Sequence, residues 1–405
     1  MLNVVVINGG RGAASLIPAL LDRQGLSVTS VVNAYDDGKS TGEIRRVFDM
    51  LGPSDLRKVQ ELMLPVDDPH RDASQALFAY RYPVGQDAAA CLADMRRFAT
   101  GGDTIAGIEI ESGAVRSALQ RFVGEFVDGL EVIQKARGLT FEFGDCALMN
   151  CLYAGAFLAC GRDMEVTTRA FDRLFRLRGT VLPNSVENKW LTALRANGEM
   201  LYSEAEIVEL RSNVRIDGLY LLDGTLDRTA FERLSLDEKK HFLDRHHTAV
   251  MASPGVVLAL QQADIIIYSA GTQHSSLYPT YMSRGVAETI AANRTALKVF
   301  VTNIGADYET PSYLSSDYIL GAHRHLCRPD SRDYPMRDLF SAVLINKSRL
   351  KADESYVEDD VDRFADIPVR RIVDAFESEA SPGKHDGSRV TGTILALYDE
   401  GGFSR

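Results

Sequence analysis

The stretch LNVVVINGGRGAASLIPALLDRQGLSVTSVVNAYDD, residues 2–37, decides the fold. It contains a run of β-branched residues, a glycine-rich turn, apolar residues at helical spacing, and then a second apolar run. Both runs are apolar almost throughout, which is typical of parallel strands that are buried on both faces. The stretch therefore predicts a βαβ unit at the start of a parallel sheet.

A second unit of this kind is predicted near the other end of the chain. The stretches ADIIIYSAG, from Ala263, and ALKVFVTNI, from Ala296, read as strands on either side of a helical segment. Residues 115–130 place apolar side chains on one helix face, and residues 143–161 are apolar nearly all round, as in a centrally packed helix. We predict an α/β fold with a Rossmann-like, doubly wound, mostly parallel sheet and helical insertions.

The predicted organisation places the Rossmann-like core in two stretches of the chain. Residues 1–83 and 141–345 form this core, and residues 84–140 form a helical insertion. Residues 346–405 supply an acidic segment and a closing helix that packs on the core.

Composition narrows the classes of function. The 405 residues carry a formal net charge of −11, which argues against a nucleic-acid-binding surface, because such surfaces have an excess of Lys and Arg. An anionic ligand would need a locally basic pocket. The five cysteines show no CxxC spacing and read as buried thiols. No apolar run reaches the length of a membrane span, so we expect a cytoplasmic protein without membrane insertion.

The first candidate ligand-binding loop lies where the first strand passes into a helix. It consists of Gly9, Gly10, Arg11 and Gly12. Glycines at such a place let backbone N–H groups approach a phosphate. The spacing matches neither the GxGxxG nucleotide fingerprint nor an ATPase P-loop. A tight turn without a ligand is the alternative.

The second candidate is DDGKSTG, residues 36–42, which follows the second strand and should emerge at the same edge of the sheet. Asp36 and Asp37 are carboxylates that suit a divalent cation or proton transfer, although adjacent residues in an extended segment cannot both face one ligand. The residues after them can hydrogen-bond a phosphate or a sugar; they are Lys39, Ser40, Thr41 and Gly42. The alternative is a solvated Asp-Gly turn.

Two further loops complete the predicted site. The stretch GPSDLRK supplies Ser54, Asp55, Arg57 and Lys58; helix capping alone explains Ser54 or Asp55, whereas two cations would suit a diphosphate. After the Ala263 strand comes a group of hydroxyls and backbone amides that could bind an anion, in Gly271, Thr272, His274, Ser275 and Ser276. A lone histidine in such a loop is more often structural than catalytic.

One more cluster suggests a metal ion. His323, His325 and Cys327 alternate in GAHRHLC, so a strand here would place all three side chains on one face. The sequence shows no fourth ligand.

Taken together and in this order, the motifs resemble the superfamily of the phospholactate transferase CofD and the YvcK-type proteins. Eight blocks spread over most of the chain carry the resemblance: INGGRG, DDGKSTGEIRR, GPSDLRK, LFAYRYP, RGTVLPNSVENKWLTALRANGE, SSLYPTYMSRGVAETI, VTNIGADYETPSYLSSDY and KHDGSRVTGTILAL. The motif details are nearer to the YvcK type.

The resemblance implies a Rossmann-like CofD fold whose loops hold a nucleotide diphosphate conjugate. YvcK-type proteins bind a UDP-sugar and act in carbon metabolism and cell-envelope control. CofD proteins use Mg²⁺ and transfer a phospholactyl-type group from a guanosine diphosphate conjugate to a deazaflavin, with release of the nucleotide monophosphate. The block for the deazaflavin branch, a GD-x-DLAT-like stretch, is not found in this sequence.

For this chain, the resemblance leads to two expected functions. The first is a YvcK-type factor that binds an NDP-sugar, and the alternative is a CofD-type transferase of phosphorus-containing groups in which Asp36 or Asp37 holds Mg²⁺ or acts as the catalytic base. Asn33 and Asp145 join the expected ligand-binding residues. We expect no nicotinamide or flavin cofactor and no nucleic-acid partner, while the inserted helices offer a surface for a second copy or another protein. A nicotinamide dehydrogenase, with Asp36 on a ribose, is a third and atypical reading.

Departures from the family pattern bring cations into the expected pocket. Arg11 replaces a usual threonine, Lys39 a usual glycine and Lys58 a usual asparagine. We hypothesise that they supply fixed positive charge to a diphosphate. The alternative is that they pair with nearby acids, which are Asp36, Asp37, Asp55 and Asp145.

Overall fold

A seven-stranded parallel sheet forms the centre of the molecule, as predicted. The computed structural model describes residues 1–10, 12–352 and 355–401. The strand order is β12-β11-β10-β9-β1-β2-β5, and each neighbouring pair is parallel. The strands are β1 (Leu2–Asn8), β2 (Leu26–Val32), β5 (Thr180–Pro183), β9 (Ile265–Tyr268), β10 (Leu297–Val301), β11 (Ala342–Asn346) and β12 (Arg370–Asp374).

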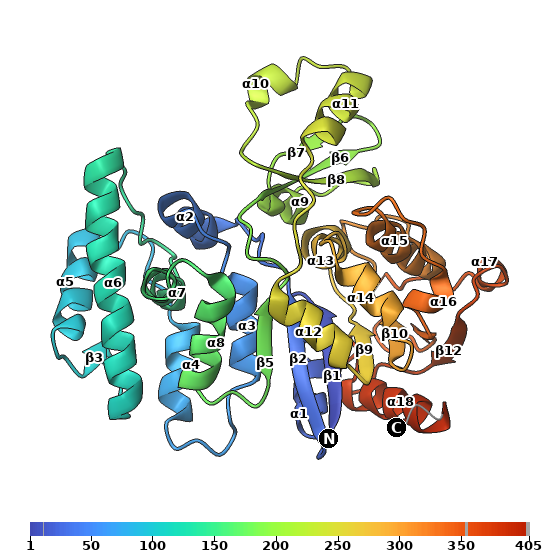
Figure 1. Cartoon of the computed structure of the whole chain (residues 1–405), viewed down its shortest axis with the longest axis horizontal. Coiled ribbons are helices and arrows are strands. Elements are labelled where there is room, and N and C mark those ends of the chain that lie inside the picture. Colours follow the sequence, from blue (N-terminus) through green and yellow to red (C-terminus); the bar gives the residue numbers. More distant parts are fainter. Residues whose placement is uncertain (11, 353–354, 402–405) are drawn as a thin grey trace.

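Helices cover both sides of this sheet (Figure 1). Before β5 these are α1 (Leu16–Leu21), α2 (Lys39–Phe48), α3 (Ser54–Leu62), α4 (Arg71–Ala79), α7 (Leu148–Ala159) and α8 (Met164–Leu174). In the second half they are α12 (Pro254–Gln262), the π-helical turn η1 (Gln273–Leu277), α13 (Tyr278–Tyr281), α14 (Val286–Ala292), α15 (Ser315–Cys327), α16 (Met336–Leu339), α17 (Val361–Phe364) and α18 (Gly387–Glu400). Among the described residues, no helix combines the length and the apolar character that crossing a bilayer would need.

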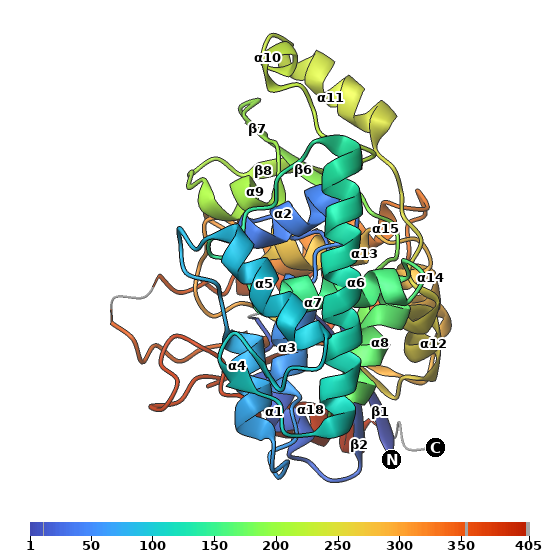
Figure 2. The same cartoon turned by 90° about the vertical axis from the view of Figure 1, so that its left-hand side faces the viewer.

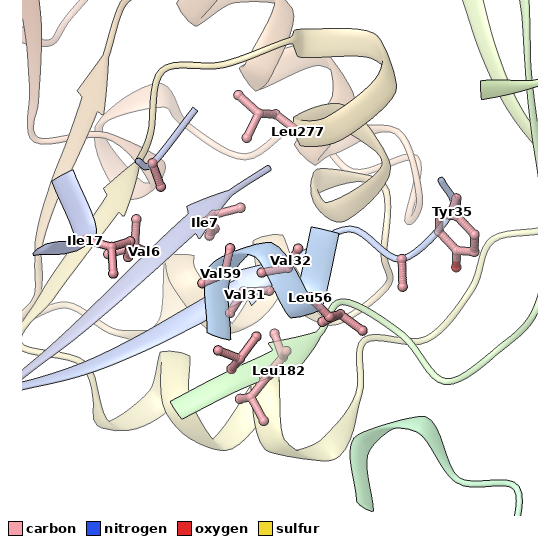
Figure 3. Packing of buried hydrophobic residues seen from close by; sticks show 14 of the residues in the cluster. Val6, Ile7, Ile17, Val31, Val32, Tyr35, Leu56, Val59, Leu182 and Leu277 are labelled. Carbon is pink, nitrogen blue, oxygen red and sulfur yellow. The ribbon is translucent and has the colours of Figure 1, made fainter. Parts of the chain in front are cut away.

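The core explains why the apolar runs become central strands. Val31 and Val32 of β2 are fully buried, and Figure 3 shows Leu56 and Val59 of α3 beside them, with Leu182 of β5 nearby. Strands covered on both faces lose nearly all contact with water. Removing apolar side chains from water is the main driving force of folding, so runs of such side chains favour these central positions. Both predicted βαβ units are confirmed, β1-α1-β2 at one end of the chain and β9 to β10 at the other.

The strand order fixes where a ligand can enter. β1 lies between β2 and β9. On one side of β1 the chain adds β2 and then β5, and on the other side it later adds β9, β10, β11 and β12, so the direction of strand addition reverses at β1. In open parallel sheets such a reversal leaves a crevice beyond the carboxyl ends of the strands. The loops after β1, β2, β9 and β10 all leave the sheet at this edge.

The 84–140 stretch forms a helical layer beside the core. It contains α5 (Ala88–Ala99), the short hairpin β3 (Thr104–Ile105) and β4 (Ile108–Glu109), and α6 (Gly113–Arg137). Figure 2 shows α6 as the long helix that crosses this side of the molecule. Its predicted apolar face packs toward α7 and α2; Phe126 stacks on Phe48 with ring centroids 5.3 Å apart.

Residues 190–247, which we call the cap, form a separate small unit above the sheet edge (Figure 1). The cap has a three-stranded antiparallel sheet with helices around it and an apolar cluster of its own. Its elements are β6 (Trp190–Arg195), β7 (Met200–Leu201), α9 (Glu204–Glu209), β8 (Ile216–Leu222), α10 (Arg228–Phe231) and α11 (Leu236–His246). The 141–345 stretch thus contains both central strands and this second sheet.

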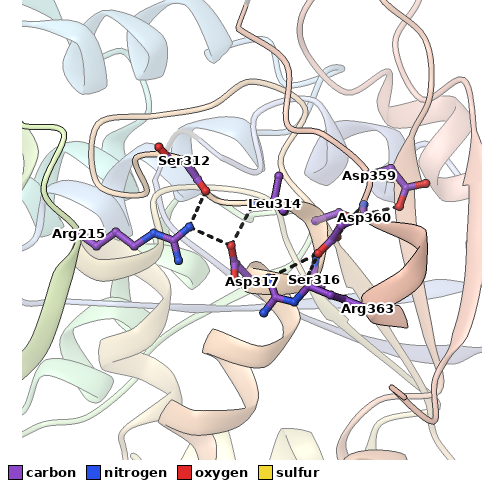
Figure 4. A network of polar contacts seen from close by, with 9 residues as sticks. Arg215, Ser312, Leu314, Ser316, Asp317, Asp359, Asp360 and Arg363 are labelled. Carbon is purple, nitrogen blue, oxygen red and sulfur yellow. Dashed lines mark hydrogen bonds and ion pairs between the residues drawn. The ribbon is translucent and has the colours of Figure 1, made fainter. Parts of the chain in front are cut away.

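A polar network holds the cap to the core (Figure 4). Asp317, in the first turn of α15, accepts hydrogen bonds through Oδ2 from Arg215 Nη2 at 3.1 Å and through Oδ1 from Arg363 Nη1 at 2.9 Å. Arg215 immediately precedes β8 of the cap, whereas Arg363 lies in α17. One carboxylate therefore joins the cap, α15 and the C-terminal region.

The last helix described, α18, packs on α1. Contact is close at Gly387, where a Cβ would lie 1.9 Å from the backbone oxygen of Ser15. Only glycine fits this approach.

Candidate ligand-binding cleft

A cleft of about 1180 Å³ opens at the carboxyl ends of β1, β2, β9 and β10. Helix α9 of the cap contributes to its wall. Most of the lining residues predicted from the sequence meet here; those described are Gly9, Gly10, Gly12, Asp36, Lys39, Thr41, Ser54, Asp55, Arg57, Lys58, Asp145, Gly271, Thr272, Ser275 and Ser276. Arg11 lies outside the described residues.

The glycine loop makes the closest approaches in the cleft. A Cβ on Gly9 would lie 2.7 Å from Ser276 Cβ, and a Cβ on Gly10 would lie 2.4 Å from Asp55 Oδ1. A Cβ on Gly12 would lie 2.3 Å from the backbone oxygen of Ala270. The loop after β1 is thus in contact with α3 and with the loop after β9, which requires residues without side chains.

The adjacent acids of the second loop turn to different surroundings. Asp36 faces the cleft, and its carboxylate accepts a hydrogen bond from Gly38 N at 2.9 Å. Asp37 is turned to the start of α9 and accepts the Ala205 N–H at 3.0 Å. Only Asp36 of the pair lines the cleft.

Asp36, Asp55 and Glu204 form an acidic group in the cleft. Burial, followed by repulsion from Asp55, raises the pKa of Asp36. Burial also raises the pKa of Glu204 well above its usual value, with repulsion from Asp36 and Asp55 as the next causes. A bound cation would offset this repulsion and favour the ionised forms of the carboxylates.

Lys39, Lys58 and Arg81, three cations of the cleft, are paired with acids. Lys58 Nζ lies 2.9 Å from Asp55 Oδ1, and Lys39 Nζ lies 3.5 Å from Asp145 Oδ2. Arg81 also binds Asp145, with Nε 2.9 Å from Oδ1. For Lys39 and Lys58, the ion-paired alternative is the one the structure contains.

Arg57 is held differently, because it binds neutral groups. Its Nε donates to Asn150 Oδ1 and its Nη1 to the backbone oxygen of Phe78, each at 3.0 Å. These contacts fix the guanidinium at the cleft wall without neutralising it. Burial, and then the charge of Arg81, lowers the pKa of Arg57.

The predicted anion-binding loop after β9 donates hydrogen bonds to a carboxylate of the protein itself. Glu309 Oε2 accepts the N–H groups of His274 and Ser275 at 2.8 and 3.0 Å, and its Oε1 accepts the Ser275 hydroxyl at 2.5 Å. Burial, and then repulsion from Asp307, raises the pKa of Glu309 to about 8. Two of the backbone amides expected to hold a phosphate thus bind a side chain of the chain itself.

His274 is a core residue and does not line the cleft. It is 1% exposed, and burial lowers its pKa to about 3. Its ring packs edge-on against Tyr278. These surroundings match the structural reading of a lone histidine.

Asn33, Ser40 and Gly42 also lie behind the cleft wall. Asn33 Nδ2 donates to the backbone oxygen of Ser275 at 2.6 Å, and the Ser40 hydroxyl accepts from Asn150 Nδ2 at 3.2 Å. A Cβ on Gly42 would lie 2.2 Å from the backbone oxygen of Asp37. These residues hold the cleft-lining loops in position.

Several lining residues were not singled out from the sequence. They are Arg81, Glu204, Ala205, Val208, Glu209, Asn303, Asp307, Lys384 and His385. Arg81, Asn303 and Lys384 fall within the blocks LFAYRYP, VTNIGADYETPSYLSSDY and KHDGSRVTGTILAL, so a signal for them was present. Glu204 reaches the cleft from the cap and has no local motif that points to it.

Known proteins resemble this chain over nearly its whole length. The model of the family described as 2-phospho-L-lactate transferase CofD matches residues 4–376. A protein named gluconeogenesis factor from Listeria innocua is 23% identical over 397 residues, which cover 97% of this chain and 95% of that protein. The protein of the same name from Listeria monocytogenes is also 23% identical over the same shares. A crystal structure of a UPF0052 family member from Bacillus halodurans superposes with a TM-score of 0.67 at 20% identity, over 98% of this chain and all of that one.

Proposed function

This chain belongs to the CofD family, and from that membership and the cleft we propose that it binds a nucleotide conjugate carrying a diphosphate, as a YvcK-type factor does. The observation that supports this most is the meeting of Gly10, Asp55 and Lys58 at the rim where the loops after β1 and β9 adjoin. A ligand at this rim would lie within reach of cations from α2, α3 and the segment after α4.

The size of the cleft suits a ligand of this kind. Pockets for small organic ligands typically have volumes of about 300–1,000 Å³. The cleft, at about 1180 Å³, is at least as large as these pockets and therefore exceeds what a lone phosphate would fill. The cleft can therefore accommodate a base, a ribose, two phosphates and a further group. Val208 on α9 supplies an exposed apolar contact at the cap side.

The charges of the cleft support a diphosphate with a bound cation. Lys58 is neutralised by Asp55, and Lys39 by Asp145. If Mg²⁺ binds to Asp36 and Asp55, Lys58 is released to a phosphate oxygen. The same cation offsets the repulsion within the acidic group, so cation and ligand should bind cooperatively.

Titration with matched ligands tests the binding proposal. The purified chain is titrated calorimetrically with UDP-sugars, GDP conjugates, UDP and UMP, each with and without Mg²⁺, and native mass spectrometry identifies what co-purifies. Diphosphate conjugates should bind at least about tenfold more tightly than the monophosphate, which corresponds to one added charge-assisted contact. Equal affinity for UDP and UMP, or no dependence on Mg²⁺, would contradict the proposal.

A transferase is the second candidate, favoured by the raised pKa of Asp36 and by the family's description. In this reaction, the acceptor hydroxyl oxygen forms a bond to the outer phosphorus and the bridging P–O bond breaks. The nucleotide monophosphate leaves with the bridging oxygen, and Asp36 takes the hydroxyl proton. Incubation of any tightly binding conjugate with Mg²⁺ and candidate acceptors, followed by chromatography for the nucleotide monophosphate, tests it. Tight binding without release supports the binding factor instead.

A further inference from the structure

Three metal-ligating side chains come together at the end of α15, away from the cleft. His323 and Cys327 lie one helical turn apart, and Asp333 comes from the loop that follows. One ligand atom from each lies within 4.8 Å of the others. The sequence suggested His323, His325 and Cys327 on a strand; the segment is helical, so Asp333 takes the place that His325 was expected to fill.

His325 is excluded from this cluster by its position in the core. It is 5% exposed, its Nδ1 is 2.8 Å from the backbone oxygen of Gly321, and its ring stacks on Tyr278 with centroids 3.9 Å apart. Residues four apart on a helix share a face, whereas residues two apart do not. The helix therefore selects His323 and Cys327 as the pair.

The spacing of this pair matches two ligands of one tetrahedral ion. Cys327 Sγ lies 3.6 Å from His323 Nε2. Zn–S and Zn–N bonds of about 2.3 and 2.0 Å at a tetrahedral angle place the two atoms roughly 3.5 Å apart, close to this distance. In addition, the Tyr334 N–H donates to Cys327 Sγ at 3.4 Å. Hydrogen bonds to ligand atoms orient ligands in metal sites.

We propose that His323, Cys327 and Asp333 bind a divalent transition-metal ion, with Zn²⁺ as the ion that fits imidazole, thiolate and carboxylate ligands together. Three protein ligands leave a fourth position for water or another oxygen ligand. Without a metal ion, His323 Nε2 is in hydrogen-bond contact with the backbone oxygen of Tyr334, at 2.7 Å. Binding replaces this contact and displaces the thiol proton of Cys327, so affinity should rise with pH.

The site would fix the loop between α15 and α16. Arg328 stands at the start of this loop and donates a hydrogen bond to the backbone oxygen of Leu219 in β8 of the cap. Its guanidinium also lies over the Tyr220 ring, 4.9 Å from the centroid. A metal ion here would therefore stabilise one attachment of the cap, at a distance from the ligand-binding loops.

Cobalt substitution tests the site directly. The full chain is stripped with a chelator and titrated with Co²⁺ alone and then with Zn²⁺ alone. One equivalent of Co²⁺ should produce a thiolate-to-metal charge-transfer band and tetrahedral visible bands, which Zn²⁺ removes. Cobalt bound to the cleft acids cannot produce this band, because none of the described lining residues is a cysteine.

Matched variants identify the ligands. Cys327→Ser should abolish the band, and Asp333→Asn should weaken Co²⁺ affinity by at least about tenfold, since even the loss of groups that only support a ligand costs about 10–100-fold. Asp333 is exposed, so its variant should fold normally. Cys160→Ser is the control and should keep the band, because Cys160 is a partly buried cysteine distant in sequence from Cys327. Absence of the band in the wild type, or its survival in Cys327→Ser, would overturn the proposal.

Discussion

Lys39 Nζ lies 3.5 Å from Asp145 Oδ2, and both residues adopt left-handed backbone conformations, with φ of 44° and 56°. This conformation costs a residue with a Cβ about 1–2 kcal/mol. Glycine, which the family resemblance leads one to expect at the Lys39 position, would carry no such cost. The chain thus carries strain at a cleft-lining ion pair, and strain of this kind is commonly retained at functional sites.

Lys39→Gly should therefore change stability and ligand affinity in opposite directions. The glycine removes the backbone strain, and the ion pair it loses is largely exposed, with 70% of the Lys39 side chain accessible, so it contributes little. We expect the free energy of unfolding to rise by up to about 1 kcal/mol, since Gly also adds entropy to the unfolded chain. Affinity for a diphosphate conjugate should fall by about tenfold or more. Chemical denaturation and calorimetric titration measure the two effects.

Lys39→Met is the matched control for that experiment. It removes the charge and keeps both the side-chain length and the strained backbone. Its affinity should fall as in Lys39→Gly, without the gain in stability. Full ligand affinity in both variants would show that Lys39 does not contact the ligand.

The neighbouring acids should respond differently to loss of charge. Asp36→Asn should reduce the Mg²⁺-dependent part of ligand affinity by about tenfold or more, because Asp36 faces the cleft beside Asp55. Asp37→Asn should leave affinity within about twofold, since Asn can still accept the Ala205 N–H at the start of α9. Titrations at several Mg²⁺ concentrations compare the pair. An equal loss in both variants would mean that Asp37 also reaches the ion.

Alanine at the glycine positions should have effects that differ by site. In Gly10→Ala, the Cβ displaces the Asp55 side chain and its ion pair with Lys58, so ligand affinity should fall more than stability does. In Gly12→Ala, the Cβ meets the backbone oxygen of Ala270, so the loops must separate and the free energy of unfolding should drop by about 1–3 kcal/mol.

Gly113→Ala is the control for both changes. Gly113 begins α6, and a Cβ added to it would meet no other described atom within 4 Å, so stability should stay unchanged or rise slightly. Binding should equal that of the wild type. Urea denaturation and ligand titration of the three variants give the comparison, and a Gly10→Ala protein with full affinity would contradict the assignment of this rim.

Stability should fall as the pH rises from about 7 to about 8, where most histidines of the unfolded chain have already lost their protons. Glu309 has a pKa of about 8 in the folded protein, so it keeps its proton while the unfolded chain, with a pKa near 4.3, has lost it. Asp172, with a pKa raised by burial to about 7, acts in the same direction. Because the folded state holds more protons, rising pH favours unfolding by up to about 1.4 kcal/mol per pH unit for each proton.

Glu309→Gln isolates this contribution. The amide keeps an oxygen acceptor for the N–H groups of His274 and Ser275 but cannot ionise. Urea unfolding at a series of pH values should give a flatter profile than the wild type. Glu125→Gln, an exposed change on α6, is the control and should follow the wild type. Identical slopes in Glu309→Gln and the wild type would rule out Glu309 as the source.

Local patterns in the sequence account for the sheet and for the position of the cleft. The apolar runs that become β1, β2, β9 and β10 identify buried parallel strands, and the Gly9–Gly10 turn marks where the first of them ends. Hydrophobic periodicity and glycine positions report on the nearest few residues, which is why they sufficed here. The sequence likewise placed Asp55 and Lys58 at the start of a helix beside that edge.

Tertiary packing decided what each side chain does at that edge. It turned Asp36 into the cleft and Asp37 to α9, brought Glu204 in from the cap, and gave the amides of His274 and Ser275 to Glu309. It also replaced a presumed strand by a helix, which joined His323 and Cys327 to Asp333. Some of these partners are distant in sequence, and others depend on which way one residue points relative to the next. Local sequence patterns report neither property, because both are determined by the packing of the complete core.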